Sequence, residues 1–366
     1  MKVTFITTIN HNVGDDFVRE GIKYLLKNVT NKKIEFEYIH KHIPITVRKG
    51  FGFIKTLKWS NRLDSIIPYG FTYDKILKAD VVIQSGAPVY WYHPPRNTCY
   101  NNEWYEPLIK KRFCLNKKAI LLNIAAGSAQ KYYSDGNEFF EDPKLKQYIT
   151  EFYNLSMVTT VRDTLVKKIF SNYNLEAKII PCSSLFANDE YNFNKTENNY
   201  IVLNYMSGGG HYGFGQNISK EKWEKTFYKI YKEIKKYHKV VMVCHNKNEL
   251  ELAKKFDNNI NTFYSNNFID YIKFYSQAIA GITNRVHSSF IMAAFGKPSI
   301  VIGTDSRARM TEMIGLKNYF VGDVTADIII EEFNLLLNKK SYYKEKLLEK
   351  KENTKKQYFN VLKGLL

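Results

Sequence analysis

The chain alternates short apolar runs with longer stretches in which apolar residues recur every three or four positions. The short runs predict strands, and the helical spacing between them predicts crossover helices. Such alternation is typical of βαβ units and mainly parallel sheets. In the first half we predict strands at Lys2–Thr7, 34–39, 81–84, 119–125, 157–161 and 177–180, and helices at 16–27, 144–153 and 163–170.

A polar segment at 188–199 contains almost no core-forming residues and is predicted to be a linker. The alternation resumes beyond it. The chain of 366 residues also exceeds the ~250–300 residues at which a single core stops growing. We therefore predict an α/β fold of two Rossmann-like domains with mainly parallel sheets, at 1–187 and 200–338, followed by a C-terminal helix at 339–366.

The terminal helix is rich in lysine: residues 339–366 hold nine lysines and three glutamates. We expect it to pack back on the N-terminal domain through its apolar positions. Its lysines then form either an ordinary solvated face or a face that contacts an anionic membrane. The candidate buried positions are Leu347, Leu348, Tyr358, Leu362 and Leu365.

Composition narrows the class of protein. No apolar run approaches the ~20 residues of a membrane span, and the first residues lack the apolar stretch of a signal peptide, so we expect a cytoplasmic protein. The four cysteines form no CxxC pair and no cluster with zinc-ligand spacing, so we expect no disulfide and no metal site.

The formal charge of +18 favours anionic ligands such as phosphates or acidic glycans, although a lysine-rich composition bias would produce it as well. We expect no nucleic-acid partner, because the chain contains no helix-turn-helix, zinc-finger or RNP motif.

Candidate chemistry lies where strands end, since open α/β sheets bind ligands beyond the carboxyl ends of their strands. After the first strand, Asn12, Gly14 and Asp15 fit either a helix cap or a site. After the strand at 81–84, Gly86 permits close approach of a ligand to the backbone.

The strongest candidate follows the strand at 280–283, where Arg285 and His287 open a helix. Free N–H groups and the helix dipole favour an anion there, an arginine can bind it in bidentate fashion, and a histidine can exchange protons. Arg307 and Arg309 follow the next strand, and Arg162 follows a strand of the first domain. These arginines are expected to converge on one multiply charged ligand.

Several motifs in this order resemble the polysaccharide pyruvyl transferase family. They are NVGD at 12–15, ADVVIQSG at 79–86, VRDTL at 161–165, VMVCH at 241–245 and GITNRVHSSFIMAAFGKPSIVIGTDSR at 281–307. The resemblance spans most of the chain, and the Arg-Val-His-Ser block with its following Gly-x-Pro is the specific part.

The resemblance implies a GT-B-like fold with an active-site cleft between an N-terminal acceptor-side domain and a C-terminal donor-binding domain. It also implies transfer of pyruvate from phosphoenolpyruvate, as a ketal, onto a glycan or lipid-linked sugar, without a cofactor. The implied donor-binding residues are Arg162, Arg285, Val286, His287 and Arg307.

For catalysis, we expect His287 to act as the acid and Asp15 or its neighbour Asp16 as the base. Asn12, Gly14, Gly86 and His245 are candidates for the acceptor side. The sequence departs from the family pattern at 85–88 and at 182–183, which both lie near the expected acceptor side. Two alternatives stay open: a GT-B-type glycosyltransferase using a nucleotide sugar, and a non-catalytic protein that binds acidic glycans.

Overall fold

The computed structural model describes residues 1–9, 12–41, 74–85, 88–93, 98–100, 109–110, 112–140, 142–191, 193, 199–257 and 259–366. Of the predicted site residues, Gly86 lies outside this described part, as does half of the predicted linker.

The N-terminal half forms a parallel sheet. In the described residues its strands follow the order β2-β1-β3-β6-β7-β8, and β6 also pairs through its far end with β4, which in turn carries the antiparallel β5. The strands are β1 (Lys2–Thr7), β2 (Glu35–His40), β3 (Val81–Gln84), β4 (Pro88–His93), β5 (Thr98–Tyr100), β6 (Ile120–Ala129), β7 (Val158–Val161) and β8 (Lys178–Ile179). The helices are α1 (Val13–Val29), α3 (Asp74–Leu77), α5 (Pro143–Leu155) and α6 (Thr164–Asn172), with 3₁₀ turns η3 (Phe113–Leu115), η4 (Asn137–Phe139) and η5 (Ser183–Glu190).

The C-terminal half forms a second parallel sheet in the order β11-β10-β9-β12-β13-β14. Numbered from β9, this is the 3-2-1-4-5-6 order of the Rossmann fold. The strands are β9 (Ile201–Asn204), β10 (Val240–Val243), β11 (Thr262–Phe263), β12 (Ala280–Thr283), β13 (Ser299–Gly303) and β14 (Asn318–Phe320). The helices are α7 (Lys220–Tyr237), α8 (Lys247–Phe256), α9 (Phe268–Ser276), α10 (Val286–Ala294), α11 (Ala326–Asn338) and α12 (Lys340–Leu362), with 3₁₀ segments η6 (Ser207–Gly209) and η7 (Ser306–Ile314).

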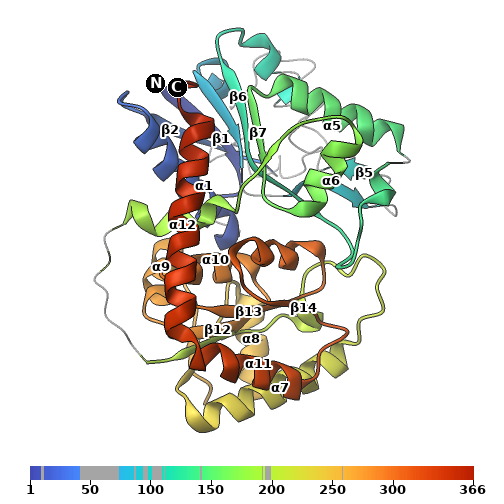
Figure 1. Ribbon diagram of the computed structural model, residues 1–366, viewed down its shortest axis with the longest axis vertical. Helices are drawn as coiled ribbons and strands as arrows, with labels where there is room; N and C mark the ends of the chain where they lie inside the picture. Colours follow the sequence, from blue (N-terminus) through green and yellow to red (C-terminus); the bar gives the residue numbers. More distant parts are fainter. Residues whose placement is uncertain are drawn as a thin grey trace, which may run out of the picture.

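The predicted pair of α/β domains with mainly parallel sheets is therefore confirmed (Figure 1). Helix α7 illustrates why the pattern predicts the fold. Its apolar residues recur at helical spacing, so Trp223, Phe227 and Ile230 are buried on one face, while Ser219 caps the first turn through Lys222 N.

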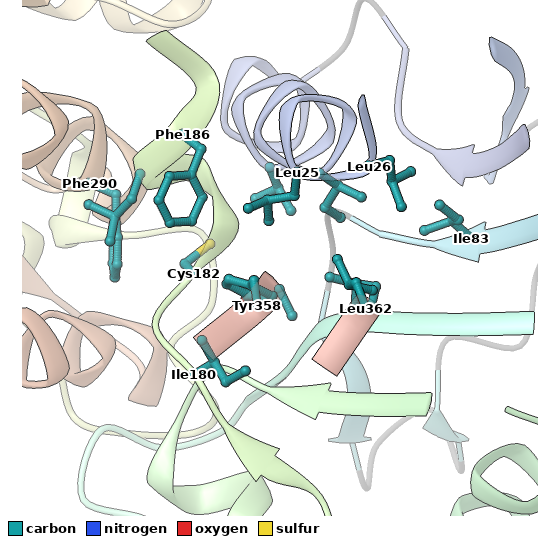
Figure 2. Packing of buried hydrophobic residues seen from close by; sticks show 14 of the residues in the cluster. Leu25, Leu26, Ile83, Ile180, Cys182, Phe186, Phe290, Tyr358 and Leu362 are labelled. Atoms are coloured by element: carbon teal, nitrogen blue, oxygen red, sulfur yellow. The ribbon is translucent and has the colours of Figure 1, made fainter. Parts of the chain in front are cut away.

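The two domains share a hydrophobic core instead of meeting only at polar surfaces. One cluster joins Leu25 of α1, Phe186 of η5, Phe290 of α10 and Tyr358 of α12 (Figure 2). Segment η5 lies between α1 and α10, and a Cβ at Gly21 of α1 would overlap the backbone of Ser183. This packing holds the two helices that approach the site from opposite domains.

Helix α12 runs along both domains (Figure 1). Tyr358 donates a hydrogen bond to Pro181 O at 3.0 Å, and the buried Lys351 pairs with Asp189 at 2.6 Å. Leu347 is buried, but Leu348 is 37% exposed, so the prediction of a buried Leu348 is wrong. The helix can bury Lys351 on its inner face because the ammonium group donates to the Asp189 carboxylate and to the Ala294 carbonyl oxygen.

Among the described residues, no helix combines the length and the apolar character that crossing a membrane requires.

Candidate active site

A cavity of about 520 Å³ lies between the domains, at the carboxyl ends of the strands. It opens where the order of each sheet reverses, after β1 in the first sheet and between β9 and β12 in the second. Those switch points are where doubly wound sheets bind ligands. The structure brings together these predicted site residues: Asn12, Gly14, Asp15, Arg162, His245, Arg285, Val286, His287 and Arg307.

The first turn of α1 forms the N-terminal wall. Asn12 caps the helix by accepting from Gly14 N at 3.1 Å, so its side chain is used structurally. The carboxylate of Asp15 accepts a hydrogen bond from the Thr8 hydroxyl and lies 3.2 Å from Nζ of Lys41. Lys41 was not predicted, because it follows the edge strand β2 at the start of a stretch without clear periodicity. Asp15 is thus a paired carboxylate at the cavity wall.

Two other predicted groups lie away from the cavity. Asp16 faces Arg19, whose Nη1 lies 2.6 Å from its carboxylate, and burial raises the pKa of Asp16 to about 6. Arg309 is 3.6 Å from Glu312 and does not line the cavity. The expectation that Arg309 meets the same anion as Arg307 is therefore wrong, because η7 turns its side chain outward.

Arg162 follows β7 and is 1% exposed. Its Nη1 lies 3.2 Å from Nε2 of His287 in the other domain and 3.5 Å from Sγ of Cys182. Its buried Nε has no hydrogen-bond partner among the described residues, and no described carboxylate lies within ion-pair distance. The neighbouring Asp163 carboxylate interacts with the charge of Arg162 but makes no ion pair with it. A buried guanidinium without a directly bonded carboxylate is costly, so this one is suited to an anionic ligand.

Arg285 is already paired. Its Nε and Nη2 donate to Glu249, which is 3% exposed, and its Nη1 lies 2.7 Å from Nε2 of His211. Burial alone would raise the pKa of Glu249, but Arg285 and the backbone N–H of His245 lower it. The bidentate edge of Arg285 is therefore occupied by a carboxylate of its own domain, which leaves the Nη1 side toward the cavity.

Arg307 is paired in the same way. Its Nε and Nη2 lie 2.8 Å and 2.7 Å from the carboxylate oxygens of Asp305, and its guanidinium lies over the ring of Tyr212. Residue 306 is held by the first domain, since Ser306 N donates to Gln130 O at 2.9 Å. Of the cavity's arginines in the described part of the chain, Arg162 is the one without a carboxylate partner.

His287 stands in the first turn of α10, whose N-cap residue makes no side-chain capping bond. Burial, with the nearby Arg162 and Arg307, lowers the pKa of His287 well below its ordinary value. In the ligand-free site the imidazole is therefore neutral and accepts from Arg162. A bound anion beside these arginines would favour its protonated form.

His245 takes part in a buried hydrogen-bond network. Its Nε2 lies 2.8 Å from the Tyr275 hydroxyl and 3.2 Å from that of Ser288, and burial lowers its pKa to about 3. At neutral pH it is an uncharged structural group at the cavity edge.

The glycine-rich loop after β9 was not predicted to take part. Gly209, Gly210, His211 and Tyr212 line the cavity. The signal was present, because Gly208, Gly210 and Gly213 have G-x-G-x-x-G spacing shortly after the apolar run that forms β9. No three or more His, Cys, Asp or Glu side chains of the described residues are grouped so that they could hold a metal ion.

The fold and cavity define a two-domain α/β protein with an arginine-lined cavity between its domains. The sequence matches the family described as polysaccharide pyruvyl transferase over residues 12–306. The chain belongs to this family, which makes it a member of a transferase family. No curated protein sequence matches it.

Several solved structures share the fold, UDP-GlcNAc 2-epimerases among them. S. aureus MnaA with UDP is 13% identical with a TM-score of 0.54, and the match covers 95% of this chain and 90% of that one. UDP-GlcNAc 2-epimerase from Neisseria meningitidis, bound to UDP-GlcNAc, is 11% identical with a TM-score of 0.52, covering 99% of each chain. The enzyme from Methanocaldococcus jannaschii, in complex with UDP-GlcNAc and UDP, is 15% identical with a TM-score of 0.51, covering 92% and 93%. The predicted GT-B-like arrangement is confirmed.

Proposed function

We propose that the protein transfers pyruvate from phosphoenolpyruvate onto two hydroxyls of a sugar, forming a ketal and releasing phosphate. Family membership supports this, and one observation carries it: Arg162, buried and without a carboxylate partner among the described residues, meets His287 at the start of α10 across the domain boundary. A carboxylate or phosphate at this point would balance the charge of the guanidinium and bond the helix N-terminus together.

The charge balance of the cavity fits a small dianion or trianion. Lys41, Arg285 and Arg307 are each paired with a carboxylate, so they position a ligand without adding net charge. Arg162 and the facing first turns of α1 and α10 supply the excess positive potential. The cavity of about 520 Å³ also leaves space for part of a sugar beside phosphoenolpyruvate.

The chemistry begins with attack of a sugar hydroxyl on C2 of the donor. A new C2–O bond forms, the C2–C3 double bond takes up a proton at C3, and the hydroxyl loses its proton. His287, protonated once the donor's charge surrounds it, supplies the proton to C3, and Asp15 receives the hydroxyl proton. The second hydroxyl then displaces phosphate. The proton transfers balance without a cofactor.

We also propose that the acceptor is a glycan or a lipid-linked sugar and that α12 brings the enzyme near anionic membrane. Its outward lysines are free of the core, whereas Lys351 is buried in an ion pair and adds nothing to this face. The exposed lysines of the helix are Lys340, Lys344, Lys346, Lys350 and Lys356.

The test is a thermal-shift comparison of phosphoenolpyruvate with UDP, followed by phosphate release with a panel of sugar acceptors. A ligand that binds only the folded state raises the melting temperature, so phosphoenolpyruvate should do so in the wild type and much less in Arg162→Ala. A shift with UDP and none with phosphoenolpyruvate would instead favour a nucleotide-sugar transferase.

A further inference from the structure

The loop after β9 presents His211 to the cavity in a fixed position. A Cβ at Gly210 would overlap the hydroxyl of Thr304, so the backbone lies directly against the end of β13. Gln216 ties the loop to both domains: its Nε2 donates to Thr304 O at 2.7 Å, and its Oε1 accepts from Tyr132 N at 3.1 Å. In a dinucleotide-binding fold a helix would start at the third glycine, but here α7 starts only at Lys220.

The contacts of His211 parallel those of His287. Each imidazole Nε2 faces an arginine Nη1, at 2.7 Å in the His211–Arg285 pair and 3.2 Å in the His287–Arg162 pair. Because a guanidinium can only donate, both imidazole Nε2 atoms are acceptors and both rings are neutral in this arrangement. The cavity thus contains two neutral histidines, and each accepts a hydrogen bond from a different arginine.

The groups that face His211 decide how it responds to a ligand. Arg285 and Arg307 face it, and each carries its own carboxylate, Glu249 or Asp305. Partial desolvation of the ring at the cavity wall and these arginines lower the pKa of His211 to about 4, although the residue as a whole is exposed. A phosphate that reaches the same arginines adds negative charge that no cation has yet balanced, so it favours a proton on His211.

Pyruvyl transfer needs acid assistance at two atoms. One is the methylene carbon of the donor, and the other is the oxygen that bridges C2 and phosphorus, because phosphate would otherwise leave as a trianion. We propose that His211 is the second acid of this site and protonates that bridging oxygen, while His287 protonates the carbon. This role rests on the pyruvyl transfer proposed above.

In the second step the C2–O bond to phosphate breaks and its electron pair stays on the bridging oxygen. His211 gives that oxygen a proton, so hydrogen phosphate departs. The second sugar hydroxyl forms a new C2–O bond and loses its proton to Asp15, which has released the first proton to solvent. No oxidation state changes, and no further reactant is needed.

The first test measures proton uptake on binding phosphoenolpyruvate, by calorimetry at pH 7 in buffers with different ionisation enthalpies. Replacing His211 by Gln, which cannot take a proton, should lower the uptake by about one proton relative to wild type. His238→Gln is the control, since His238 caps the far end of α7 outside the cavity. Equal uptake in wild type and His211→Gln would overturn the role.

The second test separates the two acids. With an accepting sugar and D₂O as solvent, His211→Gln should still place deuterium at C3. It should accumulate the intermediate in which C2 carries one sugar oxygen and the phosphate, while phosphate release falls ~10²–10⁴-fold. His287→Asn should lose both. Unchanged phosphate release in His211→Gln, or equal loss of both steps, would overturn the proposal. A wild-type protein that does not bind phosphoenolpyruvate would overturn the proposed function itself.

Discussion

Gly14 of α1 lies directly against the imidazole of His287 in the other domain: a Cβ at position 14 would stand 2.5 Å from Nδ1. Gly14→Ala must therefore displace the ring, although alanine suits a helix better than glycine. We expect a turnover loss of roughly 10²-fold with a melting temperature no lower than wild type. Steady-state kinetics and thermal unfolding measure both quantities.

The double variant provides the control for this prediction. Once His287 is replaced by Ala, the clashing ring is absent, so adding Gly14→Ala should cost little more turnover. If the two losses simply multiply, Gly14 acts through something other than His287.

His287→Asn should reduce kcat more than it raises the donor KM, because asparagine keeps a polar group but cannot protonate carbon. A general acid is typically worth ~10²–10⁴ in rate. A histidine that only binds would instead lose mainly donor affinity. A nearly unchanged kcat would therefore exclude His287 as the acid, whatever happens to KM.

Arg285→Met should destabilise the protein, because it leaves Glu249 buried without its counter-charge. Breaking a buried ion pair from one side typically costs about 3–5 kcal/mol. Adding Glu249→Gln should recover part of that loss. Urea denaturation measures the free energy of unfolding for both.

Arg309→Met is the matched control for the Arg285 variant. Arg309 forms a largely exposed pair with Glu312, and such pairs contribute only about 0–1 kcal/mol. Equal losses of stability in the Arg285 and Arg309 variants would contradict the buried-pair argument.

The sequence predicts the fold well because its local patterns and the long-range packing agree. Parallel strands buried on both faces appear as uninterrupted apolar runs, as β10 does. The shared core between the domains was less visible, because a buried residue such as Phe290 has the same pattern whether it packs within its domain or against the next.

The candidate site was predictable where chemistry follows directly from chain position, as for Arg285 and His287. Glu249 could not be found this way, since its local bonds are those of a residue at a helix start capped by Asn246. Its pairing with Arg285 depends on how β9, β10 and β12 lie together. Lys41 meets Asp15 only through the pairing of β1 with β2. These pairings arise from tertiary packing and leave no pattern in the sequence.

The outward lysines of α12 should bind anionic vesicles in co-sedimentation, with an effect of about 1 kcal/mol per lysine near the surface and a steep loss as salt rises. Replacing Lys344, Lys350 and Lys356 by Gln should weaken binding. The same change at Lys225 and Lys229 of α7 is the control. Equal recovery with neutral vesicles would assign α12 a structural role alone.

The free protein should lose stability as the pH falls from 6.5 to 5, and His245 should account for a defined part of the loss. Its pKa is lowered to about 3 by burial, against an unfolded value near ~6.5. Below pH 6.5 the unfolded chain therefore binds a proton at His245 and the folded chain does not. The contribution of neutral His245 to the free energy of unfolding is present above pH 6.5 and is lost as the pH falls below it. Over 1.5 pH units, one such group costs about 2 kcal/mol.

His245→Gln isolates that contribution. Asp16 acts in the opposite direction, because its raised pKa lets the folded state bind a proton near pH 6, but this group is common to both proteins. In the variant, Tyr275 keeps its 2.7 Å hydrogen bond to Ser288, so neither hydroxyl is left without a hydrogen-bond partner. Urea denaturation at several pH values should therefore give the variant a flatter stability profile than the wild type between pH 6.5 and 5. Parallel profiles would show that His245 is protonated in the folded state, which would contradict its position in a neutral buried network.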